Sequence, residues 1–245
     1  MDINDIENFE KEKSKYSKKD FNEIKSSIKK AWKWIWNSDS ILSWIVALGF
    51  IFVVVKFVFF PGLSLIMGTS LPLAGVESSS MDHQIVKDDL GRLNLCGNSY
   101  SSSEKEWINF NEYWDACGDW YDDVDISKNE FSDFSLKNGF RKGDIIIVWG
   151  RFSPKVGDVV IFQPNSGSLA PRPIIHRIVS IDGDGVIATK GDHNAGQLNG
   201  NNNYYKTDET NIGESQLIGK AVLKVPYLGW VKIWFVDLVK MVMGR

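Results

Sequence analysis

The order of apolar and polar positions divides the chain into four stretches. Residues 1–40 are dense in Lys, Asp, Glu, Asn and Ser and predict a polar segment, either helical or disordered. A nearly unbroken apolar run follows over 41–61, and beyond it, from 62 to 225, short β-branched runs alternate with Gly, Asp, Asn and Pro. The last stretch, 226–245, is apolar again but interrupted by charges. This pattern predicts a membrane helix followed by a mainly β domain.

The apolar run is long enough for a helix that spans a bilayer, which needs about 20 mainly apolar residues. The segment "ILSWIVALGFIFVVVKFVFFPG" carries no charge before Lys56. Ser38, Asp39 and Ser40 offer N-cap oxygens in front of it, and Pro61 followed by Gly62 predicts its end. The alternative is a buried helix of a protein core, but the 3.6-residue amphipathic period typical of such a helix is missing.

Positive charges flank this helix on one side. Four lysines precede it closely: Lys25, Lys29, Lys30 and Lys33. After Lys56, no Lys or Arg occurs before Lys87. The positive-inside rule therefore predicts a single-pass protein of the cell membrane whose N-terminus is cytoplasmic. Residues from about 62 onward would then lie on the extracytoplasmic side.

Four runs in the third stretch are typical of antiparallel strands joined by tight turns. They are "GDIIIVWG" (143–150), "GDVVIFQP" (157–164), "PIIHRIVSIDGDGVIATKGD" (173–192) and "IGKAVLKVPYLG" (218–229). Within the third run, "DGDG" at 182–185 has the composition of a hairpin turn. The predicted fold class is therefore mainly β, an antiparallel β domain behind a transmembrane helix.

An acidic, aromatic and weakly periodic segment at about 91–140 interrupts the strand pattern. It predicts an insertion, which is either a surface elaboration or a contact for a substrate or partner. Its cysteines, Cys96 and Cys117, are either paired or two free thiols, since the exported side of a membrane is often oxidising. Neither belongs to a CxxC pair, which excludes a zinc ribbon.

The final stretch, 226–245, has apolar residues at helical spacing, namely Trp230, Ile233, Trp234, Leu238 and Met241. This spacing favours an amphipathic helix that lies in the membrane interface. A second membrane span and a helix packed on the protein's own core are the alternatives. Asp237 makes a span costly.

Charge and histidine content narrow the chemistry. A formal net charge of -3 argues against nucleic acid as a partner, because nucleic acid requires a basic face. The chain has only three histidines: His83, His176 and His193. His176 lies inside "IIHRIV", where a strand would fix its direction as a general base requires; a structural histidine is the alternative. Asp192 follows the next predicted strand and is expected either to meet His176 or to cap a turn.

Five motifs occur in an order and spacing that resemble type I signal peptidases, in particular the archaeal and endoplasmic-reticulum branch. They are "SSSM" (78–81), "KGDIIIV" (142–148), "VGDVVIF" (156–162), "IIHRIV" (174–179) and "TKGDHN" (189–194). The resemblance implies a membrane-bound serine endopeptidase that removes signal peptides from exported precursors. Its expected partners are those signal peptides, membrane lipid and the protein translocation channel, and we expect no cofactor and no metal.

The resemblance also implies roles for individual residues. Ser80, immediately before Met81, matches the nucleophile, and His176 matches the general base. Asp192 matches an acidic position that supports the base. Ser78 matches a serine that helps to form the oxyanion hole, together with the backbone N–H of Ser80.

The chain departs from the family pattern at three places near these residues. Ser79 stands where the family has Gly, which strains the chain if that position needs a positive φ. His83 stands where the family has Pro. Gln197 and Leu198 stand where a second aspartate is common in this branch. Two later acids are alternatives for the catalytic acid, namely Asp208 and Glu209.

A signal peptide is expected to bind as an added strand near Ser80, since main-chain hydrogen bonds give affinity to any extended sequence. Four residues are candidates for the walls of its side-chain pockets: Val76, Ile85, Val86 and Ile145. His83 is a rival base, but three residues of extended chain place it about 10 Å from Ser80. A metal site built from His176, His193 and Asp192 matches no zinc spacing. Two other functions compete: an inactive signal-peptidase-like binding or accessory subunit, and a surface adhesion or sensor module.

Overall fold

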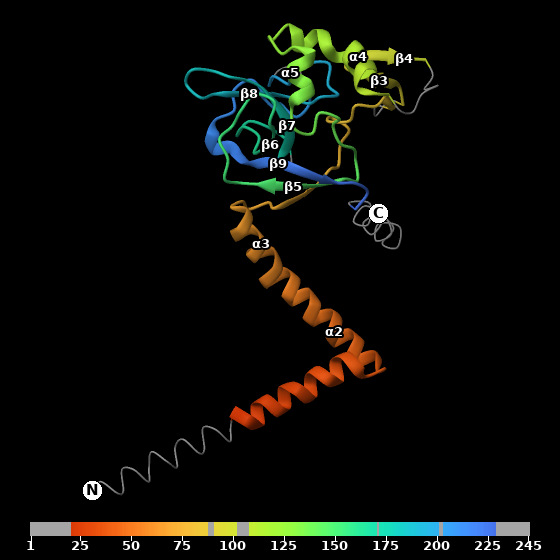
Figure 1. Cartoon of the computed structure of the whole chain (residues 1–245), viewed down its shortest axis with the longest axis vertical. Helices are drawn as coiled ribbons and strands as arrows, with labels where there is room; N and C mark the ends of the chain where they lie inside the picture. Colours follow the sequence, from red (N-terminus) through yellow and green to blue (C-terminus); the bar gives the residue numbers. More distant parts are fainter. Residues whose placement is uncertain (1–20, 88–90, 102–107, 171, 201–202, 229–245) are drawn as a thin grey trace, which may run out of the picture. The chain divides into compact units, whose positions relative to one another are not determined.

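A computed structural model describes residues 21–87, 91–101, 108–170, 172–200 and 203–228 (Figure 1). The chain divides into two compact units, Met1–Gly62 and Leu63–Arg245. Residues 21–37 of the first unit are helical, and residues 38–40 separate them from α2 (Ile41–Val54).

The start of α2 agrees with the sequence and its end does not. Ser40 caps the helix, since its hydroxyl accepts a hydrogen bond from Leu42 N at 3.3 Å. The predicted end at Pro61 was wrong, because the helix continues through a π-helical turn, η1 (Val55–Phe59), and α3 (Phe60–Met67). In an α-helix a proline ring clashes with the carbonyl one turn earlier, and the wider π turn directly before Pro61 makes room for the ring.

Helix Ile41–Met67 is long and apolar enough to cross a membrane, and it is the single such helix among the residues that the structure describes. Its side chains are mostly exposed, with Ser43 and Ala47 as the buried exceptions in α2. It ends at Gly68, whose φ of +68° is the left-handed conformation that favours glycine at a helix C-terminus.

The second unit contains a six-stranded sheet in the order β1-β5-β9-β6-β7-β8, and every pairing in it is antiparallel. Its strands are β1 (Leu73–Gly75), β5 (Ile145–Trp149), β6 (Val159–Phe162), β7 (Ile174–Ile181), β8 (Ile187–Lys190) and β9 (Leu217–Val225). A short 3-10 helix, η2 (Glu214–Gln216), leads into β9. The four predicted β-branched runs supply β5 to β9, so the mainly β fold class is confirmed.

The turn "DGDG" joins β7 to β8 as predicted. Asp182 Oδ1 accepts hydrogen bonds from Asp184 N at 2.9 Å and from Val186 N at 2.8 Å. Gly185 takes a φ of +81°. This hairpin fixes the register in which Arg177 of β7 lies opposite Lys190 of β8.

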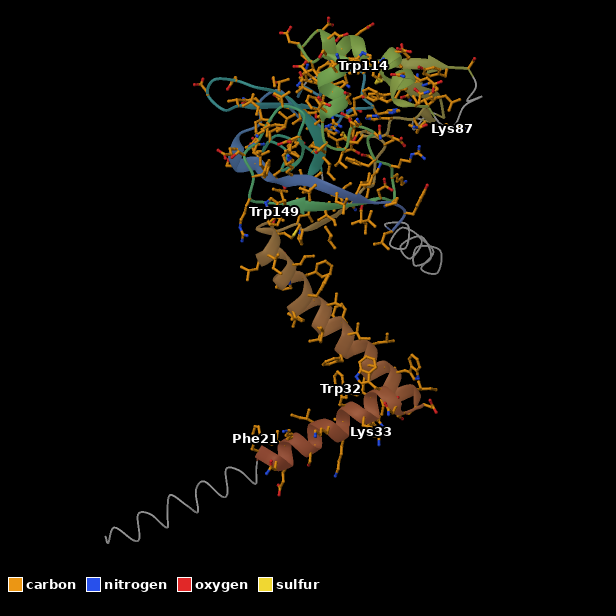
Figure 2. All side chains as sticks on the ribbon, in the orientation of Figure 1. Phe21, Trp32, Lys33, Lys87, Trp114 and Trp149 are labelled. Carbon is orange, nitrogen blue, oxygen red and sulfur yellow. A yellow bond between two sulfur atoms is a disulfide. The ribbon has the colours of Figure 1, made fainter. Side chains whose placement is uncertain are left out.

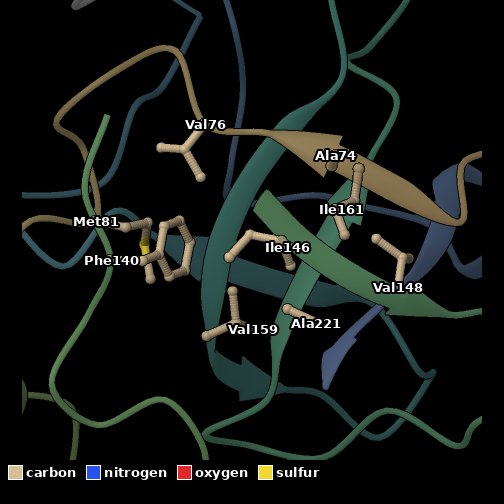
Figure 3. Packing of buried hydrophobic residues seen from close by; sticks show 9 residues of the cluster. All are labelled: Ala74, Val76, Met81, Phe140, Ile146, Val148, Val159, Ile161 and Ala221. Atoms are coloured by element: carbon tan, nitrogen blue, oxygen red, sulfur yellow. The ribbon is translucent and has the colours of Figure 1, made fainter. Parts of the chain in front are cut away.

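Both faces of the sheet are covered. One core cluster comprises Ala74, Val76, Met81, Phe140, Ile146, Val148, Val159, Ile161 and Ala221 (Figure 3). Another on the opposite face of β6 comprises Val160, Phe162, Ile178, Ile187 and Ile212. Figure 3 shows Met81 against Phe140, so the residue after Ser80 is anchored in the first cluster.

The insertion is a small subdomain with a core of its own. It contains β3 (Leu93–Leu95), β4 (Asn98–Tyr100), α4 (Phe110–Asp122) and α5 (Lys128–Asp133). Strand β2 (Val86–Lys87), just before the insertion, completes a three-stranded sheet with β3 and β4. The buried side chains of the insertion pack with Val179 of β7; they are Leu95, Tyr113, Trp114, Cys117, Tyr121, Ile126 and Phe131. The segment is therefore packed into the fold and is not a surface elaboration.

Cys96 and Cys117 form a disulfide, which decides between the two alternatives of pairing and free thiols. It joins the turn after β3 to the middle of α4. The predicted amphipathic helix at the C-terminal end lies outside the described residues from 229 onward, so it stays a prediction.

Candidate active site

Ser80 and His176 line one cavity of about 690 Å³ in the second unit. Ser78 lines it as well, and its hydroxyl oxygen lies 3.1 Å from that of Ser80. The cavity wall is otherwise mainly apolar, with Leu71, Leu73, Val76, Ile161, Ile174 and Ile175 among its residues. The predicted nucleophile and the predicted base, which lie about a hundred residues apart in the sequence, therefore line the same cavity.

Gly191 lies between the backbone carbonyl of Ser80 and the ring of His176. A Cβ added to this glycine would lie 2.7 Å from His176 Nε2 and 2.8 Å from the carbonyl oxygen of Ser80. Any larger residue would therefore push both groups away, and only glycine fits between them. Nε2 of the imidazole faces Gly191 because the other ring nitrogen, Nδ1, is hydrogen-bonded to another residue.

That other nitrogen, His176 Nδ1, is hydrogen-bonded to the carboxylate of Glu209. The same Oε1 accepts from the Thr189 hydroxyl at 3.0 Å, while Oε2 accepts from Leu198 N at 2.8 Å. Glu209 and His176 are both buried. A carboxylate only accepts hydrogen bonds, so Nδ1 carries the proton and Nε2 is left as the acceptor that a general base needs.

Asp192, the acid that matches the family motif, lies elsewhere. Its carboxylate accepts from Arg177 Nε at 2.9 Å and Nη2 at 2.6 Å, from His83 Nε2 at 2.9 Å and from the Tyr121 hydroxyl at 3.0 Å. The expectation that it meets His176 was wrong. Neighbouring residues on a strand point to opposite faces, so His176 and Arg177 diverge, and Asp192 lies on the Arg177 side.

The charges around Asp192 set its ionisation. Burial alone would raise the pKa of this carboxyl, but the Arg177 guanidinium and the hydrogen bond from His83 hold the pKa well below its usual range. Burial lowers the pKa of His83 despite the neighbouring Asp192. Burial also lowers the pKa of Lys190, to about 8. Asp192 is therefore a fixed anion paired with Arg177.

The segment 191–193 binds the backbone around Ser80, the predicted nucleophile. His193 N donates to Ser80 O at 2.9 Å, and His193 Nδ1 lies 2.9 Å from Asp82 O. Asp192 N contacts Met81 Sδ at 3.4 Å. His193 thus fixes the position of Ser80, and neither His193 nor His83 is among the residues that line the cavity.

Some of the remaining predicted site residues line the cavity and others do not. Val76 lines the cavity, whereas Ile85 packs against the insertion core, Val86 pairs in β2 and Ile145 pairs in β5. Ile85, Val86 and Ile145 are not among the residues that line this cavity. Asp208 does not contact His176; its Oδ1 accepts from Thr210 N and Thr210 Oγ1.

Two further observations bear on the sequence departures. Ser79 is not among the described residues with positive φ, so serine in place of the family's glycine introduces no such strain. Sequence reasoning missed Asn194, Tyr205 and Thr207, which line the cavity. Asn194 lies inside the motif "TKGDHN", so the sequence pattern could have indicated it as a site residue. No sequence pattern indicated Tyr205 or Thr207.

A serine hydroxyl and a histidine oriented by a buried carboxylate, at one apolar cavity, form a site of the class that carries out nucleophilic acyl transfer. Among the described residues, no group of three or more His, Cys, Asp or Glu is arranged to hold a metal ion.

Comparison with known proteins points to one family, although no family model matches the chain. Over 108 residues the chain is 35% identical to the signal peptidase complex catalytic subunit SEC11 of Zygosaccharomyces rouxii, covering 41% of this chain and 60% of that protein. The corresponding subunit of Lachancea thermotolerans is 33% identical over 106 residues (41% and 60%), and that of Colletotrichum graminicola is 30% identical over 105 residues (40% and 58%).

The chain therefore spans about three fifths of the length of these curated relatives. The resemblance to type I signal peptidases, first drawn from five short motifs, is confirmed as sequence similarity. The named relatives are eukaryotic catalytic subunits.

Proposed function

We propose that this protein is a membrane-anchored serine endopeptidase that removes signal peptides from exported precursors, with Ser80 as nucleophile, His176 as general base and Glu209 as the acid that orients the base. The observation that carries the proposal is the convergence of Ser80 and His176 on one apolar cavity, with Glu209 holding Nδ1 of the imidazole. Similarity to signal peptidase catalytic subunits supports the same conclusion.

The chemistry is acyl transfer. His176 Nε2 takes the proton of the Ser80 hydroxyl as its oxygen attacks the scissile carbonyl carbon. The resulting oxyanion is stabilised by the Ser78 hydroxyl, 3.1 Å from Ser80 Oγ, and by the Ser80 backbone N–H. His176 then protonates the leaving amine, and water, deprotonated by the same imidazole, releases the acyl group.

Glu209 is preferred to Asp192 as the acid on geometric grounds. Glu209 contacts the imidazole directly, so it fixes the tautomer and stabilises the imidazolium that forms during the reaction. Asp192 is engaged by Arg177, His83 and Tyr121, and its carboxylate supports the segment that holds Ser80.

The cavity fits an extended, small-residue substrate. β1 is the edge strand of the six-stranded sheet and its residues Leu73–Gly75 line the cavity, so a peptide is able to add as a further strand beside it. Val76, buried at the start of the loop to Ser80, narrows the wall. Precursors with small side chains before the cleaved bond are therefore the expected substrates.

Helix Ile41–Met67 and the disulfide support the proposed membrane topology. The lysines before this helix favour a cytoplasmic N-terminus. Disulfides form and persist in oxidising compartments, so the Cys96–Cys117 bond supports an extracytoplasmic catalytic domain. Anchoring in the same membrane as the signal peptide raises the effective concentration of the two. Membrane lipid and the translocation channel are the corresponding partners.

Cleavage of a precursor with an Ala-x-Ala site by the purified full chain in detergent tests the function. We expect Ser80→Ala and His176→Ala each to abolish cleavage, and Ser180→Ala, an exposed serine on the same strand as His176, to leave it unchanged. Binding of the precursor without cleavage by the unaltered chain would refute the enzyme and favour an accessory subunit. Full activity of either active-site variant would remove that residue from the mechanism.

A further inference from the structure

The helix over residues 21–37, here called the N-terminal helix, separates its side chains into two faces. At about 100° per residue, six apolar residues fall within an arc of roughly 100°. These are Phe21, Ile24, Ile28, Ala31, Trp32 and Ile35. The four lysines, Lys25, Lys29, Lys30 and Lys33, occupy a separate arc of roughly 140°.

Among the residues of the first unit that the structure describes, most of the apolar face is exposed. Ile24 is 59% exposed and Ile28 is 62% exposed, and Phe21 is exposed too. Contiguous exposed apolar surface of this kind marks an interaction site. Trp32 meets the Phe50 ring of α2 edge-on at a centroid distance of 5.8 Å.

This contact shows on which side the apolar face lies. Phe50 belongs to the helix that is apolar enough to cross a membrane, so the stripe that contains Trp32 faces the side on which α2 departs. Figure 2 labels Trp32 and Lys33, neighbours in sequence on the N-terminal helix. Residues 38–40 join the helix directly to α2, and Ser43 Oγ fixes that joint by donating to Ser38 O at 2.8 Å.

We propose that the N-terminal helix lies in the plane of the membrane surface, with its Ile24–Ile28–Trp32 stripe in the acyl region and its four lysines on anionic lipid headgroups. Charge complementarity and continuity with α2 select this occupant. Trp34 and Trp36 lie outside the stripe near the joint to α2, where indole rings suit the headgroup level. This inference goes beyond the proposed function and does not depend on peptidase activity.

Spin labels on the full chain test the proposal. Ile28→Cys reports the apolar face and Ser26→Cys the lysine face, while the native cysteines stay paired in their disulfide. After reconstitution into vesicles of phosphatidylcholine with about 30% phosphatidylserine, we expect the label at 28 to be accessible to oxygen and shielded from a water-soluble nickel chelate, and the label at 26 to show the reverse. Equal accessibility of the two labels would overturn the proposal.

The lipid charge is tested separately. Each lysine near an anionic surface raises the ratio of docked to undocked helix roughly fivefold. Replacing Lys25, Lys29, Lys30 and Lys33 by Gln is therefore expected to expose the label at 28 to the chelate. The matched control replaces four exposed lysines of the other unit by Gln, namely Lys87, Lys142, Lys155 and Lys206.

Two results would contradict the proposed binding of the N-terminal helix to an anionic membrane. Unchanged shielding in the quadruple variant, or in vesicles of phosphatidylcholine alone, would refute recognition of anionic lipid. Dipolar broadening between labels at 28 would show that a second copy of the chain covers the stripe, which would replace the membrane as the occupant. None of these spin-label measurements depends on cleavage activity, so a failed proteolysis assay would not change their interpretation.

Discussion

Glu209→Gln separates the two carboxylates that compete for the role of catalytic acid. The substitution keeps the shape of the side chain and removes its charge. In the native protein Oε1 faces His176 Nδ1 and the Thr189 hydroxyl, while Oε2 faces Leu198 N. An amide has one oxygen and one NH₂, so it is unable to satisfy both sides.

Either orientation of the amide damages the site. With its oxygen toward His176, the NH₂ meets Leu198 N–H and two buried donors remain unpaired, at a cost of about 1–3 kcal/mol. With its NH₂ toward His176, Nδ1 becomes an acceptor and the proton moves to Nε2, which then cannot accept the proton of Ser80. Both orientations also remove the anion that stabilises the imidazolium.

That electrostatic loss is about 4 kcal/mol for charges about 4 Å apart at an effective dielectric constant of about 20. At 1.36 kcal/mol per factor of ten, kcat is expected to fall about 10³-fold. KM should change little, because Glu209 is not among the residues that line the cavity. The assay is steady-state cleavage of a fluorogenic precursor peptide, with circular dichroism to verify folding.

Asp192→Asn is the matched comparison. Breaking the buried pair with Arg177 leaves an uncompensated charge, so we expect a loss of about 3–5 kcal/mol in the free energy of unfolding. Cleavage per folded molecule should be much less affected than in Glu209→Gln. A Glu209→Gln protein with more than a tenth of native kcat would refute the assignment, and so would a well-folded Asp192→Asn protein that has lost all activity.

Three further predictions concern the same domain. Burial, opposed by Arg141, raises the pKa of Asp82 to about 6, so the folded state keeps a proton that the unfolded state has released between about pH 4 and 6. The free energy of unfolding should therefore fall by at most about 3 kcal/mol as pH rises through this window. Thermal melts of Asp82→Asn should show a weaker dependence of stability on pH. An unchanged dependence would mean that a group other than Asp82 causes it. The double variant Cys96→Ser/Cys117→Ser removes a cross-link between residues 21 positions apart, and it should lower the free energy of unfolding by about 3 kcal/mol in denaturant titrations. An unchanged free energy of unfolding would mean that the bond is absent. Gly191→Ala should lower kcat at least tenfold in a folded protein, because the added Cβ displaces the base and the serine; native kcat would contradict the close approach.

The strands were predictable because each is a compact β-branched run bounded by turn residues. Their pairing into one sheet places Ser80 and His176 together, which family motifs had suggested. The carboxylate that contacts His176 was not predictable in the same way. Glu209 reaches His176 from a segment without regular strand, held by backbone bonds to Thr189 and Leu198 that no local pattern announces.

The expected contact between Asp192 and His176 was wrong for a reason that follows from strand geometry. Because β7 pairs Arg177 with Lys190, the residue two positions beyond Lys190 shares the face of Arg177. The register therefore excludes contact with His176, but the register itself requires the structure. Asp192 consequently has Arg177 as its partner.

The core of the insertion did leave a signal. Phe110, Tyr113, Trp114, Cys117 and Tyr121 recur at intervals of three and four residues, which is the period of α4. The surrounding acidic residues obscured it. The π turn before Pro61 had no sequence signal, since proline ordinarily predicts the end of a helix.

The hydroxyl of Tyr113 donates to Asp192 O, and the ring of the same residue stacks on His83 at 3.7 Å. Tyr121 donates to the carboxylate of Asp192. Deleting residues 91–140 would therefore remove the aromatic side chains that cover the Arg177–Asp192 ion pair and would expose this pair to water. A shortened chain would need a replacement for that buried pair as well, so the smallest part of the second unit that keeps this ion pair buried includes the insertion.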